Sequence, residues 1–379
     1  MLCPNNRQRT KLFECAGVAR FAYNWAISYE CDNYKSGGSF ISNYDLRKIF
    51  TQLKKTPEYS WLNKYSNNIT KQAIKDACDA FQKFFNGKAR YPKYKSKRKS
   101  KLSFFVDPVK IQFTDTHVKF EKLTQSKKRN RQKLNHIKLA ERGRIGINSK
   151  YMNPRVTFDG LNWWISVCIE QEESKDIPTN DGIGIDLGIK DLAICSDSNT
   201  YKNINKTQKV RNLKSKKRRL QRKISKKYLK NKKGVSYCKT SNIIKSEKKL
   251  LKLNQRLTNI RHNYLHQVTS EIVNRKPKFI VLEDLNVKGM MKNKHFAKAV
   301  QDQCFYEFYR QIEYKCMANN ITLVIADRWF PSSKLCSCCG HINKNLKLKD
   351  RTYKCPECGL VIDRDYQASV NLMRYGLTA

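Results

Sequence analysis

The chain has 379 residues, and its 77 Lys and Arg residues against 32 Asp and Glu residues give a formal net charge of +45. Its 40% hydrophobic and 11% aromatic residues suffice for a buried core, which excludes a chain that is disordered overall. So large a positive surplus predicts a polyanionic partner. No run approaches the ~18 apolar residues of a membrane span, and residues 1–10 lack an apolar signal region. We therefore expect a cytoplasmic protein of roughly two or three domains that binds nucleic acid and no membrane.

A helical pattern fills residues 8–85, where apolar side chains recur at steps of three and four. Asn68 precedes the last such pattern as a candidate N-cap, and Gly87 ends it. A basic stretch, 88–101, follows. Three of its side chains are candidates for stacking on unpaired bases and binding phosphates: Tyr91, Lys93 and Tyr94. For the two Phe residues just after this stretch, base stacking and core packing remain equal alternatives.

Residues 102–170 change to short alternating runs separated by turn residues, a pattern typical of antiparallel strands. The pattern predicts strands over 109–113, 117–120 and 155–158. A turn at Asp159-Gly160 makes residues 163–167 the hairpin partner of the last of these. A second basic loop, 122–133, interrupts this β module.

The second half of the chain alternates buried strands with helices, which favours an α/β fold. Strands are expected over 182–188, 192–195, 278–283 and 321–326, and helices over 298–318 and from about residue 365 onward. Between them, residues 202–233 hold 16 basic residues and no acidic one. Both this segment and residues 250–272 keep a helical spacing of apolar side chains, which predicts a helical hairpin with a strongly positive face.

The basic side chains on the first helix of this hairpin are candidates for phosphate contact. A run of like charge is usually a solvated face, but the absence of any balancing acid favours nucleic acid here. The candidates are Lys214, Lys216, Lys217, Arg218, Arg219, Arg222 and Lys223.

Four of the 14 cysteines are spaced as a metal site: Cys336-x2-Cys339, fifteen residues, then Cys355-x2-Cys358. Each pair forms a knuckle with a Gly after its second Cys, and four thiolates close a tetrahedral zinc shell. Cys338 lies outside the shell, and the remaining cysteines are scattered singly as ordinary buried thiols. Redox-active or incidental thiols are the alternative reading of the cluster.

Three acidic residues stand at the ends of predicted core elements. Asp186 and Glu283 close strands, and Asp365 opens the last helix. In an open α/β sheet, functional sites lie at the carboxyl ends of the strands, so the three carboxylates can converge there. Together they can hold two Mg²⁺ ions about 3.5–4 Å apart, an arrangement that promotes phosphodiester cleavage. Each alone is better explained as a turn or cap residue. Their joint presence in so basic a chain favours a metal site.

These residues lie in segments that resemble the TnpB proteins encoded by bacterial insertion sequences, relatives of the type V CRISPR effectors. The matching segments are 184–188, 218–223, 256–266, 282–290, 330–334 and 363–365, with weaker matches at 21–25 and 91–95. The resemblance is dense from about residue 182 to residue 373. It implies that Asp186, Glu283 and Asp365 are the catalytic triad. It also adds Arg256 and Arg261 to the candidates for nucleic-acid contact.

The fold implied by the resemblance is an RNase H-like RuvC nuclease domain with a helical insertion and a four-cysteine zinc ribbon. A β-barrel wedge domain, interrupted by a helical recognition domain, precedes it. The expected boundaries are 1–10 for the start of the wedge domain, 11–100 for the recognition domain, 101–178 for the barrel, 179–330 for the nuclease domain with its insertion at 205–275, 331–362 for the zinc ribbon and 363–379 for the last nuclease helix. Because the chain begins almost at a Pro4-Asn5 turn, the sequence leaves open whether the first strand of the barrel is present.

The implied activity is RNA-guided cleavage of double-stranded target DNA beside a short motif, by Mg²⁺-dependent hydrolysis. One protein would bind one guide RNA from the transposon end, with zinc as a structural ion. Two alternatives stay open: a nuclease-dead, RNA-guided DNA-binding repressor, and a transposase or accessory protein of transposition. The family favours Asn two residues after its last catalytic Asp, where this chain has Gln367. We do not expect this conservative change to abolish metal binding.

Overall fold

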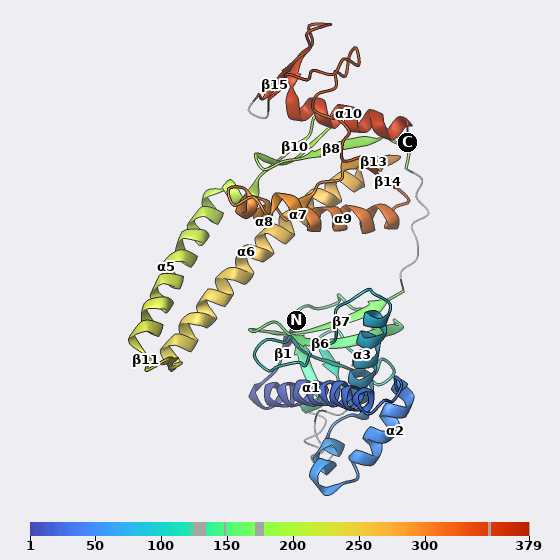
Figure 1. The fold of residues 1–379 in the computed structure, drawn as a ribbon, viewed down its shortest axis with the longest axis vertical. Coiled ribbons are helices and arrows are strands. Elements are labelled where there is room, and N and C mark those ends of the chain that lie inside the picture. Colours follow the sequence, from blue (N-terminus) through green and yellow to red (C-terminus); the bar gives the residue numbers. More distant parts are fainter. Residues whose placement is uncertain (122, 124–133, 148, 171–177, 348–349, 379) are drawn as a thin grey trace. The chain divides into compact units, whose positions relative to one another are not determined.

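The computed structural model describes residues 1–121, 123, 134–147, 149–170, 178–347 and 350–378. Its contacts divide the chain into two compact units, Met1–Gln171 and Glu172–Ala379. Each unit has its own sheet (Figure 1) and its own hydrophobic core. The basic loop predicted at 122–133 lies, apart from residue 123, outside the described residues. In the described part of the chain, no helix has the length and apolar character needed to cross a membrane.

Helices fill the first part of the first unit, as the periodicity predicts. They are α1 (Asn6–Lys35), α2 (Asn43–Leu53), the 3-10 helix η1 (Pro57–Lys64) and α3 (Asn67–Phe85). A reciprocal capping box between Asn5 and Gln8 starts α1. The predicted cap of α3 at Asn68 is wrong. Ser66 takes this role because its hydroxyl accepts a hydrogen bond from the Asn68 backbone N–H.

Among the described residues, the sheet of the first unit has seven antiparallel strands in the order β2-β6-β7-β1-β5-β4-β3. The strands are β1 (Leu2–Cys3), β2 (Leu102–Phe105), β3 (Gln112–Phe113), β4 (His117–Lys119), β5 (His136–Leu139), β6 (Tyr151–Phe158) and β7 (Trp163–Ile169). The predicted hairpin is confirmed, since Phe158 pairs with Trp163 across the Asp159-Gly160 turn.

β1 fills a place in this sheet that the sequence left in question. Leu2 pairs with Leu139 of β5 on one side and with Trp163 of β7 on the other. Leu2 is also buried in the core of the unit. The chain therefore has a strand before the Pro4-Asn5 turn, and the suspected absence of that strand is corrected.

The sheet of the second unit combines antiparallel and parallel strands. β8 (Ile183–Leu187), β9 (Asp191–Cys195) and β10 (Thr200–Lys202) form an antiparallel meander. On the other side of β8, β13 (Phe279–Glu283) and β14 (Thr322–Ala326) run parallel to it, which gives the order β10-β9-β8-β13-β14. The four strands predicted for this half are confirmed, and β10 was missed because three residues carry too little pattern.

Helices cover both faces of this sheet, as Figure 1 shows: α10 (Arg364–Thr378) on one face, and α6 (Ser241–Asn274) and α9 (Phe305–Ala318) on the other. Ile185 and Leu282 belong to the core shared with α6 and α9, whereas Val281 packs with Leu372 of α10. Successive residues of β8 and β13 thus alternate between the two layers.

Gly184 brings α10 unusually close to β8. A Cβ at this position would lie 2.1 Å from the backbone O of Ser369 and 2.3 Å from the backbone N of Met373. Backbone atoms cannot move aside as the end of a flexible side chain can, so Gly184→Ala should destabilise the second unit by about 3 kcal/mol. Urea denaturation would measure the loss.

The matched control is Gly17→Ala, because Gly17 lies inside α1 with nothing within 4 Å of its added Cβ. This change should stabilise the first unit by about 0.5–1 kcal/mol. An unchanged unfolding midpoint of the second unit in Gly184→Ala would contradict the close approach of α10.

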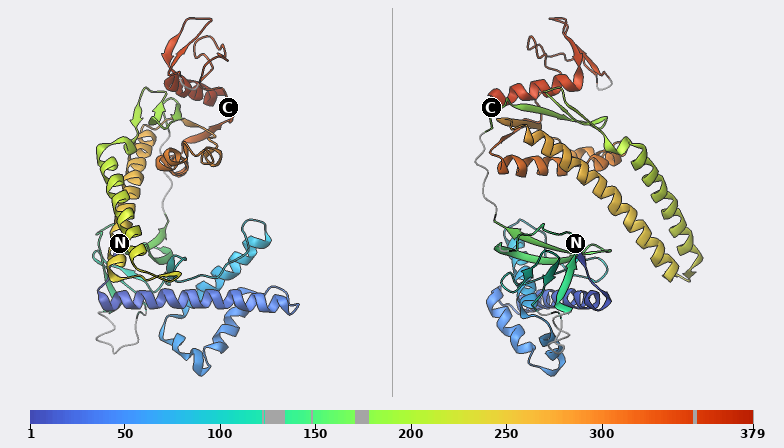
Figure 2. Two further views of the ribbon diagram at one scale, coloured as in Figure 1. Left: turned by 60° about the vertical axis from the view of Figure 1, so that its left-hand side comes forward. Right: turned by 180° about the vertical axis from the view of Figure 1, so that it is seen from behind.

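The predicted helical hairpin is confirmed. α5 (Gln208–Lys230), which follows the 3-10 turn η2 (Ile204–Lys206), lies beside α6 in both views of Figure 2. The short strands β11 (Lys232–Lys233) and β12 (Ser236–Tyr237) join them at the tip. On α5 only Val210 and Ile224 are buried, so most of this helix presents charge to solvent.

The single helix predicted over 298–318 is wrong. The chain forms α7 (Val287–Met290), then α8 (Ala297–Gln303), and a separate α9 after it. The break lies at Cys304, whose φ of 57° and ψ of 43° are left-handed, a conformation that residues other than Gly rarely adopt. Apolar residues continue on both sides of the break, so periodicity alone does not reveal it.

Candidate functional site

The structure sets Asp186 and Glu283 at the same level of the sheet. β8 and β13 run parallel in a register that brings the two residues side by side at the ends of neighbouring strands. Two residues earlier on each strand, Gly184 and Val281 pack against α10. Because alternate residues of a strand share a face, Asp186 and Glu283 also lie on the α10 face.

Asp365 reaches the same region from the first turn of α10. Together with Asp186 it lines a pocket of about 570 Å³. Its Oδ2 lies 3.5 Å from Nη1 of Arg351. The neighbouring Asp363 has a different task, since its carboxylate accepts hydrogen bonds from the backbone N–H groups of Asp365 and Tyr366 and so caps the helix.

The three carboxylates are electrostatically coupled. The pKa of Asp186 is raised well above its usual value, first by burial and then by the charges of Glu283 and Asp365, which Arg364 offsets only in part. A divalent cation relieves such repulsion, and Mg²⁺ prefers oxygen ligands, so this donor set fits that ion. The carboxylates are less tightly gathered than the cysteines: in the described part of the chain, only the four-cysteine group has all its ligand atoms within 4.8 Å.

Glu283 is held by the segment that leads into the cysteines. The Ser332 hydroxyl donates a hydrogen bond to Glu283 Oε1. The same segment is fixed on α10 by Gln367, which is fully buried. Its Nε2 donates to the Leu335 carbonyl O at 2.6 Å, and its Oε1 accepts from the Ser337 hydroxyl at 2.8 Å. The residue at which the chain departs from the TnpB pattern therefore anchors the cysteine segment.

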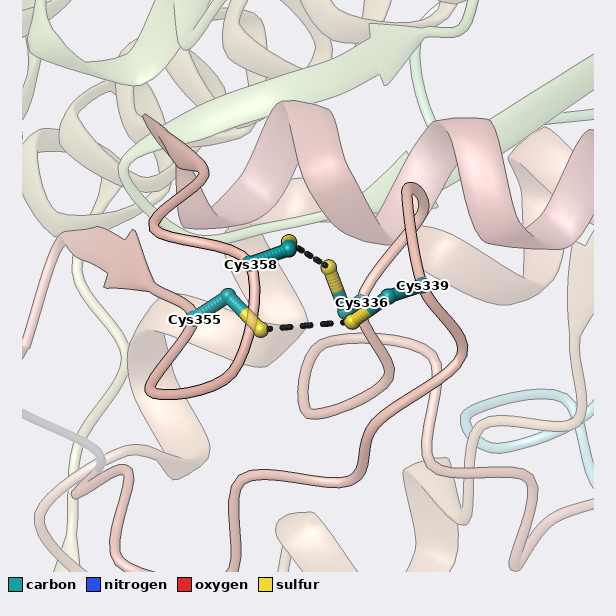
Figure 3. Close-up of side chains that lie close together, drawn as sticks. All are labelled: Cys336, Cys339, Cys355 and Cys358. Carbon is teal, nitrogen blue, oxygen red and sulfur yellow. Dashed lines mark hydrogen bonds between the residues drawn. The ribbon is translucent and has the colours of Figure 1, made fainter.

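The four cysteines predicted to bind zinc come together (Figure 3). The Sγ atoms of Cys336 and Cys358 are 3.6 Å apart, and those of Cys339 and Cys355 are 3.5 Å apart. A tetrahedral site with Zn–S bonds of about 2.3 Å has S–S edges of about 3.8 Å, close to these values. Cys338 is exposed and stays outside the group, as predicted.

Two matching turns form this cluster. Gly340 and Gly359 have positive φ values of 77° and 71°. Their N–H groups donate to the carbonyl O of Cys336 at 3.0 Å and of Cys355 at 3.2 Å. Hydrogen bonds from the backbone, first from Cys358, lower the pKa of Cys355 to about 6, which favours its thiolate. Both the spacing and the chemistry of the cluster fit a metal such as zinc.

The basic residues predicted on the hairpin divide into two groups. Six are exposed: Lys216, Arg218, Arg219, Arg222 and Lys223 on α5, and Arg256 on α6. Lys214 and Arg261 instead bind Asp302 at the end of α8, with N–O distances of 2.7 Å and 2.5 Å. Both line a pocket of about 460 Å³ together with Lys217 and Lys298. The hairpin thus presents an exposed basic surface and, beside it, a pocket lined by basic side chains.

The candidates for nucleic-acid contact in the stretch 88–101 are exposed: Tyr91 and Tyr94, predicted to stack on bases, and Lys93. Tyr91 stands edge-on to Phe84 of α3, with ring centroids 5.2 Å apart. Asn24 of α1 makes two hydrogen bonds to the backbone of Lys95 and so holds the stretch on the helices. Both tyrosine rings are about half exposed, which suits stacking, and the ring of Tyr91 also packs against α3. For Phe104, however, core packing is the correct alternative, since it is 3% exposed.

Four supporting residues were missed from the sequence: Asp302, Gln303, Ser332 and Arg351. Three of them act through contacts between elements far apart in the chain, such as Asp302 with Lys214, 88 residues away, whereas Arg351 contacts Asp365, 14 residues away. No spacing rule connects such pairs. The available signals were that Ser332 lies in a matching segment, 330–334, and that Asp302 is an isolated acid among basic residues.

Known proteins are similar to this chain over nearly its whole length. A relative from Streptomyces pristinaespiralis, provisionally named an RNA-guided DNA endonuclease, is 30% identical over 376 residues, 99% of this chain and 88% of that protein. InsQ of Escherichia coli K12, named in the same way, is 26% identical over 391 residues, 99% of this chain and 90% of that protein. The chain belongs to the TnpB family of transposon-encoded RNA-guided endonucleases.

Three family descriptions match successive parts of this TnpB protein: a helix-turn-helix domain over residues 1–39, the “Probable transposase” OrfB of IS605 over 166–294, and a Cas12f1-like TNB domain over 305–372. The second contains Asp186, Glu283 and the basic hairpin. The third contains the four cysteines and Asp365. In this TnpB protein the first match covers β1 and one uninterrupted helix, α1.

Among solved structures, a complex of Cas12f1 with guide RNA and target DNA is similar to this TnpB protein. The TM-score is 0.59 at 15% identity, over 97% of this chain and 82% of that one. At this identity the similarity concerns the fold, and it confirms the mixed α/β architecture expected from the sequence.

Proposed function

We propose that this TnpB protein is an RNA-guided DNA endonuclease that hydrolyses target DNA at a RuvC-type, Mg²⁺-dependent site formed by Asp186, Glu283 and Asp365. The observation that carries the proposal is the convergence of the three carboxylates from β8, β13 and α10, which raises the pKa of Asp186. The sheet order, an antiparallel meander followed by two parallel strands, is that of an RNase H-like fold and supports the RuvC assignment.

The residues of the site would divide the work as follows. Asp186, Glu283 and Asp365 would hold Mg²⁺, which supplies activation of water and stabilisation of the leaving oxygen when bound. Ser332 orients the Glu283 carboxylate by donating a hydrogen bond to it. Arg351, beside Asp365, brings positive charge to the pocket where a scissile phosphate would sit.

The partners that fit this surface are a guide RNA from the transposon end and double-stranded target DNA. The net charge of +45 extends over several surfaces, including the exposed face of α5 and the stretch 88–101. A protein that delegates sequence reading to base pairing needs extensive phosphate contact along an RNA and a heteroduplex, and so broad a charge suits that use better than a single DNA groove.

A nuclease-dead, RNA-guided DNA-binding protein is the second candidate. The observation in its favour is that, among the described residues, the oxygens of the three carboxylates are not gathered within 4.8 Å of one another as the four sulfurs are. A transposition role is the third, in keeping with the description of the OrfB family. Cleavage without joined products separates the endonuclease from a transposase, and cleavage itself excludes the nuclease-dead form.

The direct test is to sequence the RNA that co-purifies with the protein when its gene is expressed with its own flanking DNA. We expect one discrete RNA species that includes sequence from the end of the element. Its affinity should fall with salt at a log–log slope of about −0.7 per neutralised phosphate of single-stranded RNA. A heterogeneous RNA population without a dominant species would contradict RNA guidance.

A further inference from the structure

One buried side chain, that of Gln303, makes a hydrogen bond to the turn that follows Asp186. Gln303, the last residue of α8, is 3% exposed, and its Nε2 donates to the carbonyl O of Gly188 at 2.7 Å. Gly188 lies two residues after Asp186 and lines the same pocket, whereas Gln303 is not among the residues that line it. The contact therefore supports the backbone of the proposed site without touching what would bind there.

Gln303 is in turn fixed by the base of the basic hairpin. Its neighbour Asp302 binds Lys214 of α5 at 2.7 Å and Arg261 of α6 at 2.5 Å. Asn205, which precedes α5, donates to the Asp302 carbonyl O at 2.8 Å and to Gln303 Oε1 at 3.4 Å. The end of α8 is thus bound from η2, α5 and α6.

The rest of the turn after Asp186 is held from the same side. Asn203 Nδ2 donates to the Ile189 carbonyl O at 2.8 Å, and Lys206 Nζ donates to the Lys190 carbonyl O at 2.9 Å. Both donors belong to the segment that leads into α5. The carbonyl groups of three successive residues that follow Asp186 in the chain, 188–190, therefore all accept hydrogen bonds. The donors belong to the base of the hairpin and to the end of α8, which is bound to that base.

The backbone conformation of the residue after Gln303 indicates that the end of α8 is held firmly in place. Cys304 is left-handed, a conformation that is unfavourable for an L-residue other than Gly. Such a conformation persists only where the surrounding contacts outweigh its cost. The hydrogen bonds and ion pairs of Asp302 and Gln303 are contacts of this kind immediately before Cys304 in the chain.

We propose that Gln303 is a positioning residue of the carboxylate site, and that Asp302 ties it to the basic hairpin. Gln303 fixes the Gly188 turn and, through two residues of backbone, the Asp186 carboxylate. The inference rests on the proposed function in one respect only, namely that Asp186 binds a divalent metal.

The test compares two isosteric substitutions at buried glutamines. Gln303→Met keeps size and burial but removes the donor to Gly188. The matched control is Gln311→Met on α9, which is also fully buried. It removes the hydrogen bonds of Gln311 with Glu307 at 2.9 Å and Thr269 at 3.0 Å, so a general loss of stability should affect both variants.

The first readout is Mn²⁺ binding to RNA-free protein by calorimetry, with Asp186→Asn identifying the signal from this site. Gln303→Met should raise the Kd for Mn²⁺ about tenfold or more, and Gln311→Met by less than about twofold. The second readout is single-turnover cleavage by RNA-loaded protein. Gln303→Met should slow it about tenfold or more, while the Kd for target DNA stays within about twofold of the wild type.

Equal losses of Mn²⁺ affinity in the two glutamine variants, or no loss in either, would overturn the positioning role. The titration needs no RNA, so it remains decisive if the wild type fails to cleave. A wild type that binds Mn²⁺ through Asp186 but does not cleave would contradict the proposed function and leave the positioning role to the titration. A wild type without any Asp186-dependent Mn²⁺ binding would overturn both.

Discussion

Asp186→Asn is expected to abolish DNA cleavage and to leave guide-RNA binding intact. The substitution removes a carboxylate from the set that would hold Mg²⁺ but preserves the size of the side chain. The basic surfaces of α5 and of the stretch 88–101 are unchanged, so RNA binding should persist. Loss of an essential metal ligand should lower the single-turnover rate constant by about 10³-fold or more. Cleavage of a labelled target by the RNA-loaded protein, beside a filter-binding measurement of RNA affinity, checks both expectations.

The matched control is Asp191→Asn. Asp191 lines the same pocket, but its Oδ1 lies 3.5 Å from Lys202 Nζ and it belongs to neither the proposed metal set nor the basic surface. This variant should cleave at the wild-type rate. Undiminished cleavage by Asp186→Asn would overturn the assignment. If both variants lost cleavage, the cause would be the negative charge of the pocket as a whole and not a specific role of Asp186.

The same Asp186→Asn substitution should stabilise the metal-free protein above pH 4. Burial and the charges of Glu283 and Asp365 raise the pKa of Asp186, so the folded protein keeps a proton that the unfolded chain releases near its usual pKa of about 4. Stability is therefore lost as the pH rises above that value, and Asn escapes this loss.

Thermal denaturation checks this sign. The Tm difference between variant and wild type should be close to zero in acid and should grow toward neutral pH. Mg²⁺ should then raise the Tm of the wild type and not that of the variant, because only the wild type binds it at this site. A Tm difference that is independent of pH would argue against the coupling of the three carboxylates.

Loss of the metal expected at the four cysteines should slow cleavage by about 10²-fold or more, although no cysteine belongs to the proposed catalytic set. The cysteine region supports two of the three carboxylates: Ser332 donates to Glu283, and Arg351 lies beside Asp365. Its own core is small, comprising Tyr353 and two of the cysteines with a few half-buried apolar residues. Because burial alone gives so small a core little stability, we expect its order to depend on a metal held by the four cysteines.

Cys355→Ser and Cys338→Ser separate this structural role from a general effect of removing a thiol. Cys338 is exposed and lies outside the four-sulfur group, so its variant should keep the zinc content and the cleavage rate of the wild type. Cys355→Ser should lose zinc and cleave about 10²-fold more slowly or worse, since both carboxylate supports are released. Metal analysis and single-turnover cleavage on the same preparations measure this. A zinc-free Cys355→Ser protein that cleaves at full rate would contradict the dependence.

Patterns among residues close together in the sequence predicted much of the secondary structure and the cysteine group. The alternation in 155–167 predicted the β6–β7 hairpin, and the helical spacing on either side of the tip predicted α5 and α6. The pairwise spacing of Cys336, Cys339, Cys355 and Cys358 predicted a group whose sulfurs do meet. These features depend on residues close together in the chain, where periodicity and turn chemistry act. The domain boundaries and the roles of Asp186, Glu283 and Asp365 stay predictions.

Long-range contacts decided what those patterns left open. The break at Cys304 directly follows Asp302 and Gln303, whose partners Lys214 and Gly188 lie 88 and 115 residues away. The inclusion of β1 in the first sheet likewise depends on Leu139 and Trp163. A hydrogen bond or strand pair of this kind exists only once distant elements have packed, so no local spacing encodes it.

The sequence by itself therefore determined the family, the class of partner implied by a charge of +45, and which carboxylates and thiolates stand at the ends of which elements. Those follow from composition and from patterns within a few turns of chain. Only the tertiary structure decided how these groups are supported. Gln303 donates to Gly188, two residues after Asp186, Ser332 donates to Glu283, and Gln367 anchors the cysteine segment. The partner of a buried polar group is set by the geometry of the packed elements around it.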